Sequence, residues 1–286
     1  MPLLARPGKP TLHYRMDDYT DPWVDAGVIV LQHGYARSMR LWYGWIPQLA
    51  RRYKILRMDL RGHGDSPVDF DPAAGHTLEA YVEDILAVMN HLKLADAHYC
   101  GESFGGIIGM ALAAMHPKRV RTLTLVASPV YQNKNAAYAA GFATREEALR
   151  TLGTPAWARA IYGAPGFFPP GTPQALREWY VNELGQSNAE VLCGLYGLLK
   201  HANASALLPR IAAPVLGLYP TAGPLTSSEQ EDLLTAHIKN LNMIHLPTQS
   251  HAIVTIEADT CAQHLLHFAT TQDKTKPQSG TIAATR

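Results

Sequence analysis

The sequence predicts an α/β fold: a doubly wound, mostly parallel sheet with a helical insertion. Short β-branched apolar runs alternate with amphipathic stretches along most of the chain, which is typical of buried parallel strands connected by helices. The alternation breaks once, over residues 130–208, where alanine-rich and aromatic-rich helical pieces replace the strand signal. A serine flanked by glycines, in GESFGG (101–106), stands at the junction between a predicted strand and a predicted helix.

The strand candidates are short runs that end in turn residues. An early, loosely alternating run is followed by buried runs rich in Val, Ile and Leu, and one of them leads directly into the glycine-flanked serine. Such continuous apolar runs suit strands that are covered on both faces. We expect strands at 11–17, 28–34, 53–59, 98–102, 120–128, 214–220 and 242–247.

The clearest helix candidate covers 77–94, TLEAYVEDILAVMNHLKL. Its apolar residues recur at helical spacing on one face, and Thr77 suits the N-cap position. The same spacing predicts a helix over 41–53, with Trp42 and Trp45 as core residues.

These elements suggest three regions. Residues 1–129 and 209–271 would form the sheet domain, and 130–208 would form a helical lid inserted into it. The polar, aperiodic segment 272–286 has the composition of a disordered tail.

Composition excludes several classes of function. Lys and Arg number 25 against 24 Asp and Glu, and no basic block occurs, so binding to nucleic acid or to an anionic membrane is not expected. Three well-separated cysteines without a Cys-x-x-Cys spacing argue against disulfides and zinc sites. The N-terminus has no signal-peptide pattern, and no apolar run is long enough to span a membrane. We therefore expect a cytoplasmic monomer or homodimer that acts on a small molecule without metal or organic cofactor.

Ser103 has the sequence context of a nucleophile. Gly-x-Ser-x-Gly between a strand and a helix forms a tight, strained turn that raises the hydroxyl above the sheet edge. Glycines flank it because larger side chains would collide with the neighbouring strand and helix. A plain glycine-rich turn is the alternative.

A serine nucleophile needs a base, usually histidine. In this arrangement the base follows the last strand, and His251 in HLPTQSHAIV has that position among the 13 histidines. The reaction also needs backbone donors for the oxyanion. The N–H of Phe104, directly after Ser103, and the N–H of Tyr35, after His33 and Gly34, are the candidates.

Several segments together resemble the α/β-hydrolase superfamily over about residues 11–270. They are HGYARSMRLW (33–42), MDLRGHGDS (58–66), GESFGG (101–106), HPKRVRTLTLVAS (116–128) and SHA (250–252). YRMDDYTDPW (14–23) and RTLTLVASPV (121–130) are similar to 3-oxoadipate enol-lactonase-like hydrolases. The resemblance implies a serine hydrolase with an oxyanion hole and a cap domain.

The sequence departs from the family where an acid should orient the histidine. Members usually place this acid after the penultimate strand, but Thr221, Ala222 and Gly223 stand there. A second known location, after the strand that follows the elbow, holds Ser128. Three explanations remain open: a Ser–His dyad in which a hydroxyl or a backbone carbonyl holds the imidazole, a more distant carboxylate such as Glu229, or a pocket that only binds.

The lid is rich in aromatic residues that could enclose an apolar or ring-bearing substrate, although many must pack the lid itself. The pocket candidates are Gly34, Trp157, Tyr162 and Trp179. Arg37 and Arg40 either meet a substrate carboxylate or are solvent-facing loop charges. We expect hydrolysis of a small, hydrophobic or aromatic carboxylic ester or lactone. Hydrolysis of a C–C bond, acyl transfer and ligand binding without catalysis are the alternatives.

Overall fold

An eight-stranded sheet forms the centre of the computed structural model, which describes residues 2–132, 138–164, 166–223 and 227–275. The strand order is β1-β2-β4-β3-β5-β6-β7-β8. β1 and β2 pair antiparallel, β2 pairs antiparallel with β4, and all further pairs are parallel. The predicted mostly parallel sheet is therefore confirmed. Its strands are β1 (Leu3–Arg6), β2 (Lys9–Asp17), β3 (Val28–Gln32), β4 (Lys54–Met58), β5 (Ala97–Glu102), β6 (Val120–Val126), β7 (Val215–Pro220) and β8 (Leu241–Leu246).

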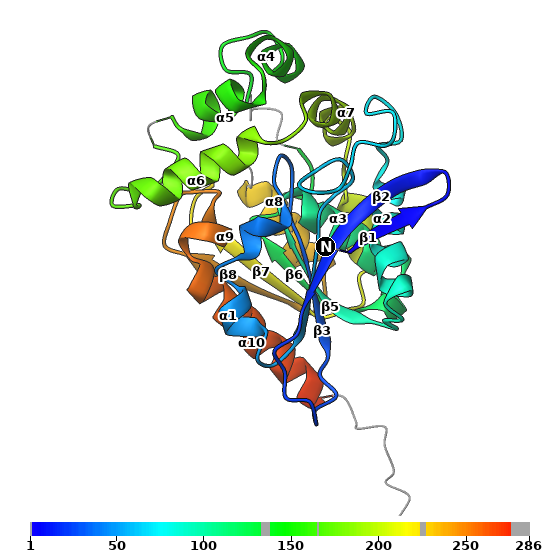
Figure 1. Ribbon diagram of the computed structural model, residues 1–286. Coiled ribbons are helices and arrows are strands. Elements are labelled where there is room, and N and C mark those ends of the chain that lie inside the picture. Colours follow the sequence, from blue (N-terminus) through cyan, green and yellow to red (C-terminus); the bar gives the residue numbers. More distant parts are fainter. Residues whose placement is uncertain (1, 133–137, 165, 224–226, 276–286) are drawn as a thin grey trace, which may run out of the picture.

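The central strands explain the apolar runs of the sequence. Every residue of β3 and β5 is buried, because helices cover both faces of the sheet (Figure 1). The short β1 was not predicted. It carries only four residues and forms a hairpin with β2 around Gly8, whose φ of +69° suits a tight turn.

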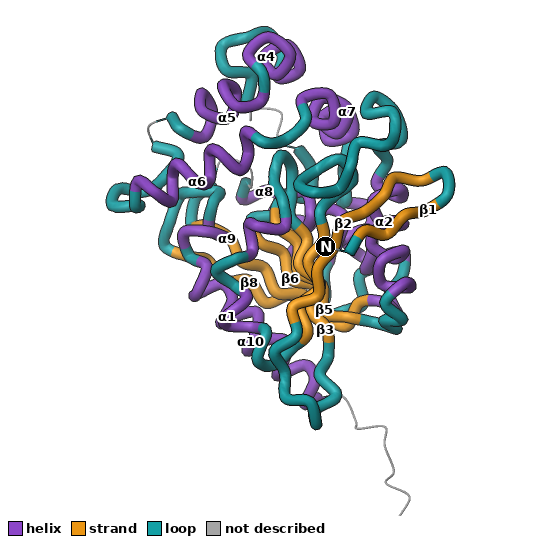
Figure 2. Tube along the Cα trace, in the orientation of Figure 1, coloured by secondary structure: helices purple, strands orange, loops and turns teal. Residues whose placement is uncertain are grey.

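The helices divide between the two faces of the sheet, as the tube in Figure 2 also shows. α1 (Ile46–Leu49) and α10 (Ala258–Thr275) pack against each other on one face. α2 (Leu78–His91) and α3 (Phe104–Met115) cover the other face, and α8 (Ser228–His237) follows them there. This doubly wound arrangement also confirms the expected fold class.

Two helix predictions had different outcomes. Thr77 caps α2 as expected, since its side chain accepts a hydrogen bond from the N–H of Ala80. The continuous helix over 41–53 was wrong, because the chain forms a 3-10 turn, Met39–Trp42, and then the short α1. Pro47 has no N–H to donate and Gly44 is a poor helix former, so the pattern is interrupted. Trp42 and Trp45 are fully buried all the same.

The insertion between β6 and β7 supplies four helices above the carboxyl ends of the strands (Figure 1). We call them the cap helices: α4 (Arg145–Leu152), α5 (Thr154–Tyr162), α6 (Gln174–Gly185) and α7 (Ala189–Leu199). Residues 133–137 and 165 of the expected lid lie outside the described residues.

The C-terminal helix is longer than expected. α10 reaches Thr275, so the first residues of the segment expected to be disordered, 272–275, are helical, and 276–286 lie outside the described part of the chain.

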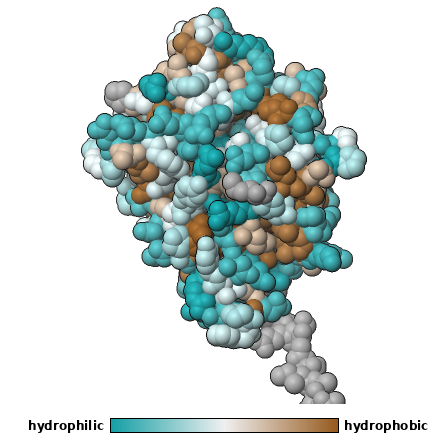
Figure 3. All heavy atoms as spheres, in the orientation of Figure 1, coloured by the Kyte–Doolittle hydropathy of each residue, from teal (hydrophilic) through white to brown (hydrophobic). Residues whose placement is uncertain are grey.

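On the face in Figure 3, hydrophobic side chains gather in patches between hydrophilic ones. None of the helices formed by the described residues is long and apolar enough to cross a membrane.

Candidate active site

Ser103 stands in the sharp turn between β5 and α3. Its backbone has φ 51° and ψ −117°, a conformation that costs a non-glycine residue energy and that functional sites retain. The flanking glycines leave room for the turn. A Cβ on Gly101 would lie 2.3 Å from the carbonyl oxygen of Gly105, and one on Gly105 would lie 2.3 Å from that of Gln32. The local sequence therefore permits a bend that few other residues could form.

A narrow cavity, about 40 Å³ in volume, opens above Ser103 and below the cap helices. Its lining combines residues of the sheet domain with residues of the insertion. They are Tyr35, Arg37, Ser103, Phe104, Ile107, Pro129, Gln132, Tyr138, Arg145, Tyr162, Leu199 and His251. The structure thus brings the expected nucleophile, base and oxyanion residues to one enclosed space.

His251 follows β8 in a loop that is fixed on both sides. The hydroxyl of Ser250 donates to the carbonyl oxygen of Phe167, and the indole N–H of Trp45 donates to that of Val254. The imidazole is buried, and burial together with the positive charge of Arg37 lowers its pKa to about 3. His251 is therefore neutral near pH 7 and able to accept a proton. No direct hydrogen bond joins it to Ser103 in the described structure.

The loop after β3 presents the second oxyanion candidate. His33 fixes this loop, because its Nε2 accepts the N–H of Leu60 and its Nδ1 therefore donates to the carbonyl oxygen of Gly34. Neither the N–H of Tyr35 nor that of Phe104, the first residue of α3, donates to another described residue, so both remain available beside Ser103.

Glu102, which the sequence reading passed over, lies at the centre of the site. Its buried carboxylate accepts hydrogen bonds from the N–H of Gly34 (3.0 Å) and from Nε of Arg37 (3.2 Å). Burial raises its pKa, and the charge of Arg37 opposes that rise. This pair ties the loop after β3 to the end of β5, directly before Ser103. A charged residue at the end of an otherwise apolar strand was the signal for it.

Arg37 and Arg40 have different environments. The Arg37 side chain is buried and lines the cavity, so its alternative as a solvent-facing loop charge is wrong. Arg40 is partly exposed and pairs with Glu183 of α6.

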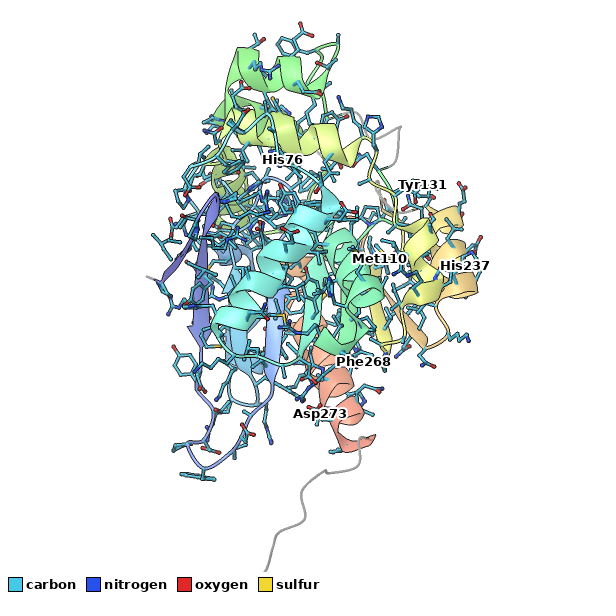
Figure 4. The ribbon with its side chains drawn as sticks, turned by 90° about the vertical axis from the view of Figure 1, so that its right-hand side faces the viewer. His76, Met110, Tyr131, His237, Phe268 and Asp273 are labelled. Atoms are coloured by element: carbon cyan, nitrogen blue, oxygen red, sulfur yellow. The ribbon has the colours of Figure 1, made fainter. Side chains whose placement is uncertain are left out.

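None of the three candidate orienting residues has a hydrogen bond or ion pair with His251 among the described residues. Ser128 is buried and donates to the carbonyl oxygen of Gly101, while Thr221 donates to that of Thr248. Glu229 is exposed at the start of α8 and interacts with the hydroxyl of Tyr131. Figure 4 shows Tyr131 on the α8 side of the molecule.

The nearest carboxylate to His251 is instead Glu102. The undescribed positions contain no Asp or Glu, so every acidic side chain of the chain belongs to a described residue. Among these, Glu102 alone has an oxygen within 4.0 Å of an imidazole nitrogen of His251, with Oε1 3.7 Å from Nε2.

Of the four expected pocket residues, one lines the cavity above Ser103 and three do not. Tyr162 lines the cavity. Trp157 is fully buried behind it, and its ring packs edge-on against Tyr35 and Tyr162. Gly34 is not among the residues that line the cavity and lies against Glu102. Trp179 packs near Tyr43, beside a separate small cavity that Arg37 also lines.

Arg145 is a lining residue that the sequence did not reveal. It begins α4 and has its guanidinium carbon 4.0 Å from the centre of the Tyr196 ring. No local motif marks it, because the packing of the insertion alone brings it to the cavity.

One group of side chains has the composition of a metal site: His13, Asp59 and Asp65. Both carboxylate oxygens of Asp59 already have partners. Oδ1 accepts a hydrogen bond from the backbone N–H of Met39. Oδ2 accepts one from the backbone N–H of Asp65 and also pairs with Nδ1 of His13. These bonds hold the loop after β4 in place, so the group fits a structural network better than a metal site.

Comparisons with known proteins agree with this fold. A family model described as alpha/beta hydrolase fold matches residues 27–180. The chain is 26% identical over 215 residues to 3-oxoadipate enol-lactonase 2 of Acinetobacter baylyi, which covers 75% of this chain and 78% of the relative. It is 24% identical over 277 residues to a putative carbamate hydrolase, RutD, of Stutzerimonas stutzeri, which covers 96% of this chain and 100% of the relative.

Among solved structures, the enol-lactonase from Burkholderia xenovorans LB400 is similar to the whole domain. The TM-score is 0.83 at 26% identity, and the match covers 94% of this chain and 100% of that chain. The likeness therefore includes the cap helices as well as the sheet.

Proposed function

Because the chain belongs to the α/β-hydrolase family, we propose that it hydrolyses a small carboxylic ester or lactone through Ser103 and His251. The observation that carries the proposal is the strained backbone of Ser103, beneath a cavity that His251 also lines. Strain of this kind persists only where the surrounding structure enforces it. The similarity to enol-lactonases supports the reaction class.

In the proposed mechanism, Oγ of Ser103 attacks the carbonyl carbon while His251 takes its proton. The N–H groups of Tyr35 and Phe104 hold the oxyanion. The protonated His251 then gives its proton to the leaving oxygen. Next it activates a water molecule that releases the acid from Ser103.

The acid-free loop after β7 limits the substrate class. In a template serine enzyme, disabling the orienting acid lowers the rate on the order of 10⁴-fold. A Ser–His dyad therefore suits an activated acyl group, such as an enol ester, an aryl ester or a strained lactone, better than an amide. The narrow cavity favours a compact substrate.

Ser103→Ala tests the proposal. We expect this variant to fold and to lose turnover of 4-nitrophenyl butyrate and labelling by a fluorophosphonate probe, whereas the wild type shows both. Ser228→Ala is the matched control, since Ser228 is an exposed serine of α8. Wild-type turnover in Ser103→Ala would refute the mechanism.

A ligand-binding protein without catalysis is the second candidate. The lack of a carboxylate at either customary acid position favours it. The same labelling decides, because an activated Ser103 reacts with the probe and an inactive one does not.

A further inference from the structure

Arg145 is a buried cation at the cavity with no partner for its charge. Its residue is only 5% exposed, and it lines the same cavity as Ser103 and His251. No acidic side chain lies within 4.0 Å of its guanidinium nitrogens in the described structure, and the undescribed positions contain none. A buried charge without a counter-charge is costly, so such groups usually have a partner.

Part of the hydrogen-bonding capacity of Arg145 is also unused. Its Nε and Nη2 are buried and have no hydrogen-bond partner among the described residues. These two atoms form one edge of the guanidinium group, the edge that can grip both oxygens of a carboxylate. Nη1 of Arg37, another buried lining atom, is likewise without a partner.

The surroundings of Arg145 stabilise its charge without neutralising it. Its guanidinium carbon lies 4.0, 4.9 and 5.2 Å from the ring centres of Tyr196, Tyr138 and Tyr35. Burial raises the pKa of both Tyr35 and Tyr138, so these hydroxyls stay neutral. The rings therefore offer cation–π contacts but no anion.

The other charges of the cavity do not compensate Arg145. Arg37 is paired with Glu102, and His251 is neutral. The cavity therefore has a positive charge in excess.

We propose that the substrate carries a carboxylate that Arg145 binds, so that the enzyme acts on a half-ester or a lactone acid of a dicarboxylic acid. This inference rests on the proposed hydrolase function and deepens it. The narrow cavity fits a planar carboxylate on a short chain. Because Arg145 belongs to a cap helix and Ser103 to the sheet domain, one substrate would contact both parts of the protein.

The alternative role for Arg145 is packing alone, as the cation that holds the tyrosines of the cap together. That role explains the ring contacts but leaves Nε and Nη2 without a function. It also predicts a different result: loss of Arg145 would affect charged and neutral substrates equally.

The test compares two esters of equal acyl length, 4-nitrophenyl hydrogen glutarate, which is anionic, and 4-nitrophenyl pentanoate, which is neutral. With spontaneous hydrolysis subtracted, we expect wild-type kcat/KM to favour the anionic ester. Arg145→Met should reduce that preference about 10- to 100-fold, the usual effect of losing a hydrogen-bonded charge pair, and Arg145→Lys should reduce it less. Arg150→Met is the matched control, because Arg150 lies on the same helix in an exposed pair with Glu190.

A binding measurement separates this inference from the proposed function. Glutarate should bind to Ser103→Ala in calorimetry and fail to bind when Arg145→Met is added. If both esters are hydrolysed equally and Arg145→Met leaves their ratio unchanged, the anion site is refuted while Ser103 hydrolysis stands. If no ester is hydrolysed but glutarate binding depends on Arg145, the hydrolase proposal fails and the anion site stands. Should Arg145→Met not fold, the wild-type preference and Arg145→Lys decide.

Discussion

Nε2 of His251 lies 3.7 Å from Oε1 of Glu102, the residue directly before Ser103. The carboxylate is also paired with Arg37, whose positive charge lowers the pKa of His251 in addition to burial. Glu102 therefore stands between the imidazole and a cation that would oppose its protonation. A nearby negative charge favours the protonated imidazole, so we expect Glu102 to support the proton transfer proposed for His251.

The first prediction concerns Glu102→Gln. The amide oxygen can still accept the N–H of Gly34, but the negative charge is lost and Arg37 is unopposed. We expect kcat for a neutral 4-nitrophenyl ester to fall about 10- to 100-fold, the effect of weakening a charge contact of one or two pKa units. Steady-state kinetics measures this directly. A variant with wild-type kcat would show that His251 works without this charge.

Stability provides the control for that variant. Removal of one partner from a buried ion pair typically costs about 3–5 kcal/mol, whereas removal of both is often nearly neutral. Glu102→Gln should therefore lower the free energy of unfolding, and Glu102→Gln with Arg37→Met should recover most of the loss. Urea denaturation of the two variants separates the stability effect from the kinetic one.

Those parts of the candidate site that local backbone constraints determine could be predicted from the sequence. Ser103 needs glycines around it, and the order of strands and helices places His251 after the last strand, so both could be found by pattern. Tyr35 and Phe104 follow from the same logic. All four line one cavity in the structure.

The remaining parts depend on contacts between distant segments. Arg145 reaches the cavity because α4 packs onto α7 and the loop that holds Tyr35, and no short motif encodes that packing. Arg37 could not be distinguished from a surface charge until its partner Glu102 was known. In the fold, the elements with weak local signals were missed or misjudged, namely the four-residue β1 and the interrupted helix around Pro47. The polar residues 272–275, expected to be disordered, form the end of α10.

The second prediction is the pH dependence of activity. Burial and Arg37 lower the pKa of His251 to about 3, so the imidazole remains a base well below pH 6.5. With a neutral ester, kcat/KM should stay constant from pH 7.5 to about 5 and decline only at lower pH. Samples returned to pH 7.5 before assay control for denaturation. A decline centred near the ordinary histidine pKa of about 6.5 would contradict the burial of His251.

The third prediction is the pH dependence of stability. The unfolded state protonates His251 below about pH 6.5, whereas the folded state does so only near its pKa of about 3. Between these values the unfolded state binds more protons, so the free energy of unfolding falls as the pH falls. One histidine contributes at most about 1.4 kcal/mol per pH unit. Urea denaturation from pH 7.5 to 4.5 should show a shallower slope for His251→Gln, and equal slopes would exclude this contribution.

The fourth prediction uses two helical glycines with opposite surroundings. A Cβ at Gly105 would lie 2.3 Å from the carbonyl oxygen of Gln32 and 2.8 Å from that of His33, which are backbone atoms that cannot move without shifting the loop after β3. Gly105→Ala should therefore cost about 2–4 kcal/mol of unfolding free energy and lower kcat. At Gly197 in α7 a Cβ meets nothing within 4 Å, so Gly197→Ala should gain about 0.5–1 kcal/mol from helix propensity. If both substitutions had the same effect in urea denaturation, the close approach of the elbow to the loop after β3 would not be what constrains Gly105.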